Sequence, residues 1–490
     1  MATTNNPGDE ILSRDATAQA EAIARGEVTP LELVDAAIAR IERLNPHLNC
    51  IIYPRFEKAR AEAADLATLR TKPLGGVPFL MKDLVQTSAG EPFSWGWKPF
   101  KDAGLCATFT SYVAAKFEAA GLITLARTTV PEWGTSISTE TRAWGATRNP
   151  WDPERSAGGS SGGAGAAVAS RIVAIAHGND AGGSIRIPAS KCGLVGLKPS
   201  RGRTSLGPAY ADFWHGLCEE GVLTRTVRDT AAALDAIAGW MPGDPYTAPP
   251  PPRSFRAELA LAPGRLRIGF MDRAPAFHSG LDNECVAAVR DTARILESLG
   301  HSVEAGSPAA LDDSAFASHF GKIVACHEAA LVPIVEKMLA RAVGPEDFDR
   351  WTWALIERGR RIPTIDYIAA CDWINTFTRA AAEWWTGGFD ILVTSTLAAP
   401  PPMLGTFQPM AGDRDAFAPG RRINQLIPFT APWNVTGQPA ISLPMHMSKE
   451  GLPVGVQFVA AYGREDILLR LAAQLEQAVP WANRRPRIHA

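Results

Sequence analysis

Two glycine-rich blocks contain the serines that are the strongest candidates for nucleophilic chemistry. Residues 158–163 read Gly-Gly-Ser-Ser-Gly-Gly and include Ser160, and residues 181–184 read Ala-Gly-Gly-Ser and end at Ser184. A serine hydroxyl is a weak nucleophile until a base takes its proton, and the oxyanion formed by its attack needs preorganised N–H donors. Glycine lets the backbone turn its amides toward a reacting group. The second block therefore combines a candidate nucleophile with a candidate oxyanion hole.

Other interpretations of these blocks fit the sequence less well. On composition alone, a flexible loop remains the commoner alternative for a segment rich in glycine and serine. A phosphate loop is excluded because G-x-x-x-x-G-K-[ST] is absent. Residues 158–162 match the G-x-S-x-G elbow of α/β-hydrolases, which needs a preceding strand and a later Asp…His pair. Residues 155–157 are a poor strand end, and later histidines such as His215, His301 and His327 lie in no distinctive context.

Lys82 is the candidate base. Most lysines are solvated surface charges, but Lys82 directly follows the apolar run Phe79-Leu80-Met81, which would carry it inward. Burial disfavours the ammonium form and lowers the pKa, so a neutral lysine could accept a proton. Asp180 and Arg186 flank the second block and are interpreted as a structural ion pair.

The elements that must position these residues alternate between helix and strand. A capping box with proline at the first helical position predicts a helix over residues 31–44. A turn at residues 75–78 leads into the strand that ends at Lys82, and a small-residue helix separates the two blocks. Further helices are expected near 57–70 and 282–299, and further strands at 266–271 and 389–394. The alternation favours an α/β layered fold.

The proline-rich segment 242–253 is the best candidate linker, since it cannot form a helix or a central strand. It would separate two domains or form a surface loop within one, and the second interpretation is preferred.

Bulk properties narrow the class of protein. The 490 residues are 46% hydrophobic and 20% charged with a net charge of −2, which gives no reason to expect nucleic acid or an anionic membrane as a partner. Seven scattered cysteines form no C-x-x-C pair, which argues against a disulfide framework or a zinc site and suits a reducing compartment. The N-terminus shows no signal peptide, and no apolar stretch would span a membrane. We expect a cytoplasmic protein without a metal or other cofactor.

Residues 158–199, together with Lys82, resemble the amidase signature family. The two serine blocks match it, and so does Cys192-Gly193-Leu194-Val195-Gly196-Leu197-Lys198-Pro199. The likeness extends from residues 75–78 to residues 437–444. It implies one α/β amidase domain over residues 1–490, with a large mixed central sheet covered by helices on both faces. Within it, the resemblance implies an N-terminal helical segment (about 14–70), a signature core (about 75–235), the connection 242–253 and a C-terminal portion (264–490) that completes the sheet and the substrate pocket.

The resemblance also assigns roles. It implies a serine amidohydrolase in which Ser184 is the nucleophile, Ser160 bridges after a cis peptide bond, and Lys82 is the base. The amides of the second block take the oxyanion-hole position: Ala181, Gly182, Gly183 and Ser184. Asn179 stands where many members have threonine, and we expect this departure to adjust only the loop.

Runs outside the signature, such as residues 143–151 and 459–466, resemble a branch of the family whose substrates are small cyclic amides. This implies that Cys326 faces the substrate, although a buried structural cysteine is the commoner role. Trp133 and Thr135, in the loop after Pro131, depart from that branch; they are further candidate substrate contacts and leave the exact substrate open. We expect an uncharged small-molecule amide of about cyclic-dimer size. Downstream aromatic residues are available for its pocket, although core packing is the commoner role for any single one of them: Phe320, Trp384, Trp385 and Trp433. A homodimer is possible.

Two alternatives stay open. An aryl acylamidase or a carbamate hydrolase would use the same signature. The A-type subunit of a tRNA-dependent amidotransferase also shares it, but the intact Lys82, Ser160 and Ser184 and the balanced charge disfavour that role.

Overall fold

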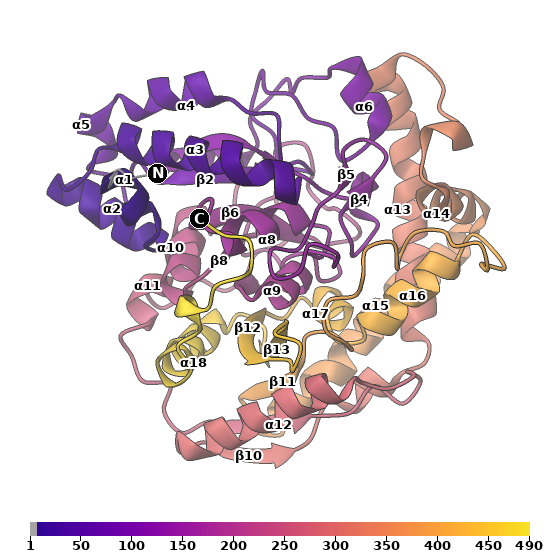
Figure 1. The fold of residues 1–490 in the computed structure, drawn as a ribbon. Helices are drawn as coiled ribbons and strands as arrows, with labels where there is room; N and C mark the ends of the chain where they lie inside the picture. The colour runs from indigo at the N-terminus through magenta and orange to yellow at the C-terminus, as the bar shows by residue number, and fades with distance from the viewer. Residues whose placement is uncertain (1–6) are drawn as a thin grey trace.

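The computed structural model describes residues 7–490, which are arranged around an 11-stranded mixed sheet (Figure 1). The strands are parallel from β3 to β6 and from β11 to β10, and antiparallel elsewhere. In spatial order they are β1 (Ile51–Ile52), β3 (Ile123–Thr128), β2 (Pro78–Lys82), β6 (Ile175–Asp180), β8 (Glu219–Thr224), β7 (Val195–Lys198), β12 (Ala440–Met447), β13 (Pro453–Ala460), β11 (Ile391–Ser395), β9 (Arg267–Met271) and β10 (Ser302–Ala305). A separate pair is formed by β4 (Glu140–Thr141) and β5 (Gly145–Ala146).

Helices surround the sheet. Figure 1 shows α1 to α5 at the upper left, α13 to α16 along the right, and α12 and α18 below. Their bounds are α1 (Pro7–Leu12), α2 (Ala16–Arg25), α3 (Pro30–Leu48), α4 (Phe56–Ala63), α5 (Leu66–Leu69), α6 (Lys98–Ala103), α7 (Tyr112–Ala119), α8 (Gly162–Ala169), α9 (Arg186–Cys192), α10 (Val227–Ile237), α11 (Phe255–Glu258), α12 (Asn283–Ser298), α13 (Phe316–Leu339), α14 (Arg350–Arg361), α15 (Thr364–Thr386), α16 (Ala418–Leu426), α17 (Ala431–Thr436) and α18 (Glu465–Ala478).

Strand β2 shows why the apolar run before Lys82 is continuous. Leu80 packs with the residues of α3 and α8 on one face of the sheet. Phe79 and Met81 pack with those of α7 and α10 on the other face. Alternate side chains of a strand point to opposite faces, so a strand covered on both faces is apolar at every position. The expected central sheet with helices on both faces is confirmed.

Most of the predicted elements form, with small shifts. The capping box of Thr29 and Glu32 begins α3, and residues 242–253 contain neither helix nor strand. The single helix expected near 57–70 is wrong: the segment forms α4 and α5, because the Asp65 side chain accepts from the Thr68 amide and starts a new turn. Strand β6 and helix α9, on either side of the second serine block, were not predicted.

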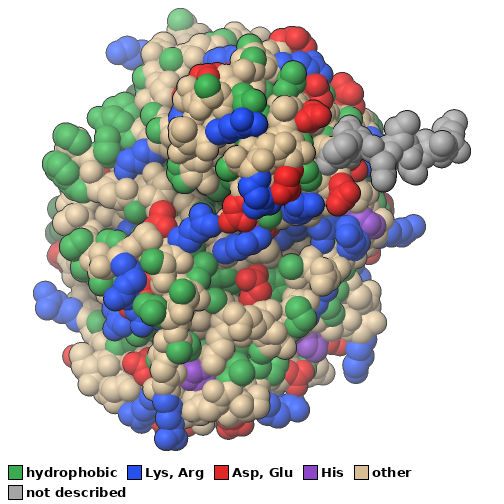
Figure 2. Space-filling view, turned by 90° about the vertical axis from the view of Figure 1, so that its left-hand side faces the viewer, with side chains coloured by type: hydrophobic (Ala, Val, Ile, Leu, Met, Phe, Trp, Pro, Cys, Tyr) green, Lys and Arg blue, Asp and Glu red, His purple; other side chains and the backbone are tan. Residues whose placement is uncertain are grey.

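The surface at the left-hand side of Figure 1 has mixed charge. Figure 2 shows Lys and Arg side chains in a band across the middle of this face, with Asp and Glu side chains within and beside the band. Within residues 7–490, no helix has both the length and the apolar character needed to cross a membrane. The expectation about a signal peptide depends partly on residues 1–6, which lie outside the described residues.

Candidate active site

The candidate residues meet at the carboxyl ends of two neighbouring parallel strands. Lys82 is the last residue of β2, and Asp180 is the last residue of β6, which pairs with β2. The loop 181–184 leaves β6 at this edge and leads into α9. Ligands commonly bind outside the carboxyl ends of strands in α/β sheets. The topology therefore brings the lysine and the second serine block together, although about a hundred residues separate them in sequence.

Lys82 is fully buried, and its Nζ lies 2.8 Å from Ser160 Oγ. The same Nζ donates to two oxygens of Asn179, the side-chain Oδ1 and the main-chain carbonyl at 3.3 Å. Burial lowers the pKa of Lys82 to about 7. A neutral amine has two N–H donors and one lone pair. With both donors directed to Asn179, the lone pair is left for the hydroxyl proton of Ser160.

The expectation that Asn179 adjusts only the loop is therefore wrong. Its carboxamide contacts the candidate base directly, and its Nδ2 donates to the Leu84 carbonyl at 3.0 Å. Because the amide is held at both ends, the oxygen that faces Lys82 is fixed in place.

The main chain of Lys82 is held on both sides. Its N–H donates to His177 Nδ1 at 3.3 Å, and His177 Nε2 lies 2.5 Å from Glu220 Oε2. Since Nδ1 accepts, the ring proton is on Nε2 and is donated to Glu220. The guanidinium of Arg127 donates to the Lys82 carbonyl at 3.4 Å. His177 thus positions the lysine backbone rather than the serines.

The two serine blocks touch each other. The Ser161 amide donates to the Ser184 carbonyl at 3.3 Å, and the Ser161 hydroxyl donates to the Asn179 carbonyl at 3.4 Å. The peptide bond between Gly159 and Ser160 is cis, as the family resemblance implied. Ser160 itself is 2% exposed.

The loop 181–184 presents unused N–H groups beside Ser184. The amides of Ala181, Gly182 and Ser184 donate to no acceptor within the described part of the chain. The Gly183 amide is already donated to Asp180 Oδ1 at 2.8 Å, and its φ of +134° lies in a region that favours glycine. Three of the four expected oxyanion donors are therefore free. Ser184 is partly exposed, so a substrate can approach it.

A buried polar network fixes this loop. Arg186 donates to both carboxylate oxygens of Asp180, at 2.8 and 2.9 Å, and to Asn434 Oδ1 at 2.7 Å. Burial alone would raise the pKa of Asp180, but the charge and hydrogen bonds of Arg186 hold it below its usual range. The predicted structural ion pair is present, and both side chains are fully buried.

Thr430 completes the support of the loop. Its hydroxyl donates to the Gly182 carbonyl at 2.7 Å, and its own carbonyl accepts from Arg186 at 2.8 Å. A residue from the C-terminal part of the chain thereby fixes the Gly182 peptide in place.

The wall beside the loop is aromatic. A Cβ added to Gly182 would lie 3.4 Å from the ring of Phe320, on α13. Tyr210 and Phe213 pack in the same cluster as Ala181. Of the aromatic residues expected to be available for the pocket, only Phe320 lies here. The other three pack against one another in a different hydrophobic cluster: Trp384, Trp385 and Trp433.

The expected substrate contacts lie at different depths. Thr135 is the neighbour of Gly134, whose backbone lies close to Ser160: a Cβ built on Gly134 would be 3.4 Å from Ser160 Oγ. Trp133 is 2% exposed and packs against Trp97 and Phe348, with ring centroids 5.3 and 4.9 Å away. Cys326 is half-buried on α13 six residues beyond Phe320. Their contact with substrate stays a prediction.

Sequence reasoning missed the residues that hold the site from outside the two blocks. Asn434, Thr430 and Gln457 bind Arg186 but lie in segments without a recognisable motif. His177 and Asn179 could have been found from the sequence, because they lie on β6, which leads directly into the second block. No three His, Cys, Asp or Glu side chains within residues 7–490 gather in a way that could hold a metal ion.

The whole chain is similar to known amidases in sequence and in fold. A family model described as Amidase matches residues 32–469. The chain is 42% identical to the 6-aminohexanoate-cyclic-dimer hydrolase of Paenarthrobacter ureafaciens over 484 residues, which cover 97% of each protein. It is similar to a solved structure of 6-aminohexanoate cyclic dimer hydrolase, with a TM-score of 0.93, 42% identity, and coverage of 97% of this chain and 99% of that one. A bacterial aryl acylamidase of the amidase signature enzymes gives a TM-score of 0.86 at 28% identity, with coverage of 96% and 98%.

Proposed function

The chain belongs to the amidase signature family and is a hydrolase of carbon–nitrogen amide bonds, and we propose that Lys82, Ser160 and Ser184 form its catalytic triad. The observation that carries the proposal is the 2.8 Å contact between Lys82 Nζ and Ser160 Oγ at a buried lysine. A lysine with a pKa of about 7 is half neutral near neutral pH, so it can accept a proton there.

The reaction proceeds in two halves. Ser160 passes its hydroxyl proton to Lys82 and takes the proton of Ser184, whose oxygen attacks the amide carbon. The free amides of Ala181, Gly182 and Ser184 stabilise the oxyanion that forms. The ammonium of Lys82 then returns its proton through Ser160 to the departing nitrogen, and the C–N bond breaks.

The second half repeats these transfers with water. Lys82 and Ser160 take a proton from a water molecule, whose oxygen attacks the ester carbon of acyl-Ser184. The second oxyanion collapses, and the proton returns to Ser184 as the carboxylic acid leaves. The triad is regenerated without a cofactor.

For the substrate we propose 6-aminohexanoate cyclic dimer or a related cyclic or linear amide. Identity of 42% over nearly the whole chain to hydrolases of that dimer supports this choice. The second candidates are aryl amides and carbamates, since an aryl acylamidase shares the fold at 28% identity.

A substrate panel tests the choice. The purified chain is incubated with the cyclic dimer, a linear amide, an aryl amide and a carbamate, and product release is followed for each. Ring opening of the dimer faster than cleavage of the others supports the proposal. If aryl amides are cleaved and the dimer is not, the proposed mechanism stands and the proposed specificity for the dimer is wrong.

Cys326→Ala tests the proposed substrate contact. It should change KM or substrate preference and leave the nucleophile intact.

We also propose that the chain works alone, as one domain over residues 1–490, in the cytoplasm, with a homodimer as one possible assembly. A single sheet with strands from residue 51 to residue 460 supports the single domain. Activity of the purified chain without any partner would exclude the role of an amidotransferase subunit, and sedimentation would establish the oligomeric state.

A further inference from the structure

The segment 134–138 packs directly against the bridging serine. A Cβ built on Gly134 would lie 3.4 Å from Ser160 Oγ. A Cβ built on Gly159, the residue before Ser160, would lie only 2.7 Å from the carbonyl oxygen of Ser136. Only glycine lets the two backbones approach one another so closely. The position of Ser160 therefore depends on where the segment 134–138 lies.

Thr135, within this segment, is bound by the first turn of α14. The Trp351 indole donates to the Thr135 carbonyl at 3.0 Å. The Thr135 hydroxyl donates to the Glu132 carbonyl at 3.0 Å and lies 3.1 Å from the Thr352 hydroxyl. Because a hydroxyl has one proton, the Thr135 hydroxyl accepts from Thr352. Helix α14 thus holds Thr135 through both its main chain and its side chain.

A third contact joins the start of α14 to the beginning of the same turn. The Asp349 amide donates to Glu132 Oε1 at 2.8 Å. Asp349 is the N-cap residue of α14, and its own side chain makes no capping hydrogen bond. The Glu132 side chain is buried. The turn 132–135 is therefore tied to α14 at both of its ends.

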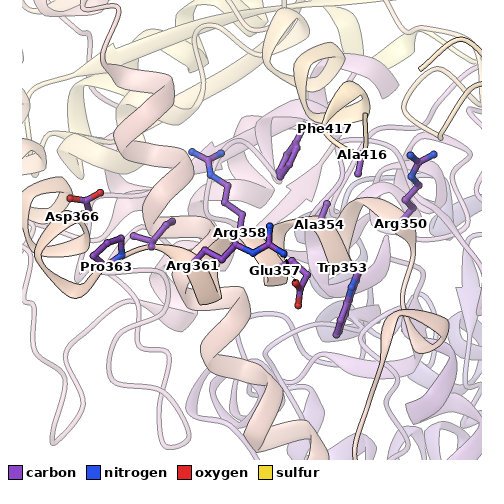
Figure 3. A pocket seen from close by; sticks show the side chains of 11 residues that line it. Arg350, Trp353, Ala354, Glu357, Arg358, Arg361, Pro363, Asp366, Ala416 and Phe417 are labelled. Carbon is purple, nitrogen blue, oxygen red and sulfur yellow. Dashed lines mark hydrogen bonds and ion pairs between the residues drawn. The ribbon is translucent and has the colours of Figure 1, made fainter. Parts of the chain in front are cut away.

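The two sides of α14 have different surroundings. Arg350 and Arg358 project to the outer side, where they line a cavity of 780 Å³ (Figure 3). Thr352, Leu355 and Ile356 are buried on the opposite side. Because a cavity and not a packed element lies on the outer side, the position of the helix is set by its inner side and by its contacts with the turn.

We propose that Trp351 and Thr352 are positioning residues for Ser160, which they hold within reach of Lys82 through Thr135 and the segment that contains it. The inference rests on the proposed triad, because it affects the reaction only if Ser160 transfers the proton. Ser160 Oγ lies 2.8 Å from Lys82 Nζ, and a small displacement of a reacting group lowers the rate steeply. Thr352 is 1% exposed, so it acts through Thr135 and not by contact with the substrate.

Thr352→Val tests the proposal, with the amide that is cleaved fastest in the substrate panel. The variant replaces the hydroxyl by a methyl group of similar size and removes the hydrogen bond to Thr135. We expect kcat to fall about tenfold and KM to stay near the wild-type value, since one hydrogen bond is lost and substrate binding is not touched. Thr352→Ser keeps the hydroxyl and should restore most of the rate. Trp351→Phe, which loses the indole N–H, should lower kcat in the same way if Thr352→Val folds poorly.

Thr230→Val is the matched control. Thr230 is also buried, and its hydroxyl lies 2.7 Å from the Thr224 hydroxyl. Thr224 pairs with Ile175 at the start of β6, whereas the candidate site lies at the other end of that strand, at Asp180. The control therefore removes the same kind of contact away from the site and should leave kcat near the wild-type value. Urea titrations of both variants show whether their losses of stability are alike.

The Ser160→Ala background separates this inference from the proposed triad. In that background Thr352→Val should cause no further loss of kcat, because the side chain that it positions is gone. A second tenfold loss there, or an unchanged kcat in both Thr352→Val and Trp351→Phe, would overturn the positioning role. Near wild-type activity of Ser160→Ala itself would instead overturn the triad.

Discussion

Replacing Asn179 by aspartate is expected to move the acidic limb of kcat/KM to higher pH. Asn179 Oδ1 accepts from Lys82 Nζ, so the substitution places a carboxylate against the buried amine. An opposite charge at this distance raises a lysine pKa by roughly two units, from about 7 toward about 9. Only the neutral amine accepts a proton, so activity rises with pH through the lysine pKa. At pH 7 the neutral fraction falls from about one half to about 1%, a loss of roughly fifty-fold in kcat/KM.

The assay is a pH profile of kcat/KM from pH 5 to pH 10. The deficit of Asn179→Asp should shrink as the pH rises above the new pKa. Asn179→Thr keeps a neutral acceptor and should keep the limb near that of the wild type. Asn283→Asp is the control for charge, because Asn283 is exposed at the start of α12. An acidic limb that stays in place in Asn179→Asp, or an equal deficit at every pH, would refute the role given to this contact.

Three further predictions follow from the site and its surroundings. Lys82→Ala should lower kcat/KM by about 10²–10⁴-fold and abolish the acidic limb of the pH profile. Ser160→Ala should lower kcat/KM by less, because water can relay the proton. Equal rates for Lys82→Ala and the wild type would contradict the role of Lys82 as the base. Arg186→Met leaves the buried Asp180 carboxylate unpaired and should reduce the free energy of unfolding by about 3–5 kcal/mol in urea titrations. Burial raises the pKa of Glu328 to about 8, so the folded state holds the carboxyl proton more tightly than the unfolded state does. The free energy of unfolding is therefore largest below the unfolded pKa and falls as pH rises toward 8. Glu328→Gln removes this loss and should raise Tm more at pH 8 than at pH 5.

The local parts of the site could be predicted because short-range chemistry determines them. The apolar run before Lys82 indicated a buried strand end, and the structure has β2 ending there with the lysine fully buried. The glycines of the second block predicted backbone amides available to a ligand, and three of four are free. The capping box predicted the start of α3 correctly, because its hydrogen bonds join residues three positions apart.

The remainder depends on contacts between distant segments. Thr430 supports Gly182, and Arg358 lies beside Gly321, through packing that no periodicity or motif encodes. The contact between Asn179 and Lys82 escapes prediction for a different reason. The sequence shows only that Asn179 departs from the family pattern, and without strand β6 nothing places its side chain beside Lys82.

Covalent labelling of Ser184 tests the catalytic triad most directly. The enzyme is treated with a fluorophosphonate, and intact mass and peptide mapping locate the adduct. We expect one adduct, on Ser184, which is absent in Ser184→Ala and forms more slowly in Lys82→Ala. An adduct that persists in Ser184→Ala, or one that maps to Ser160, would show that Ser184 is not the nucleophile.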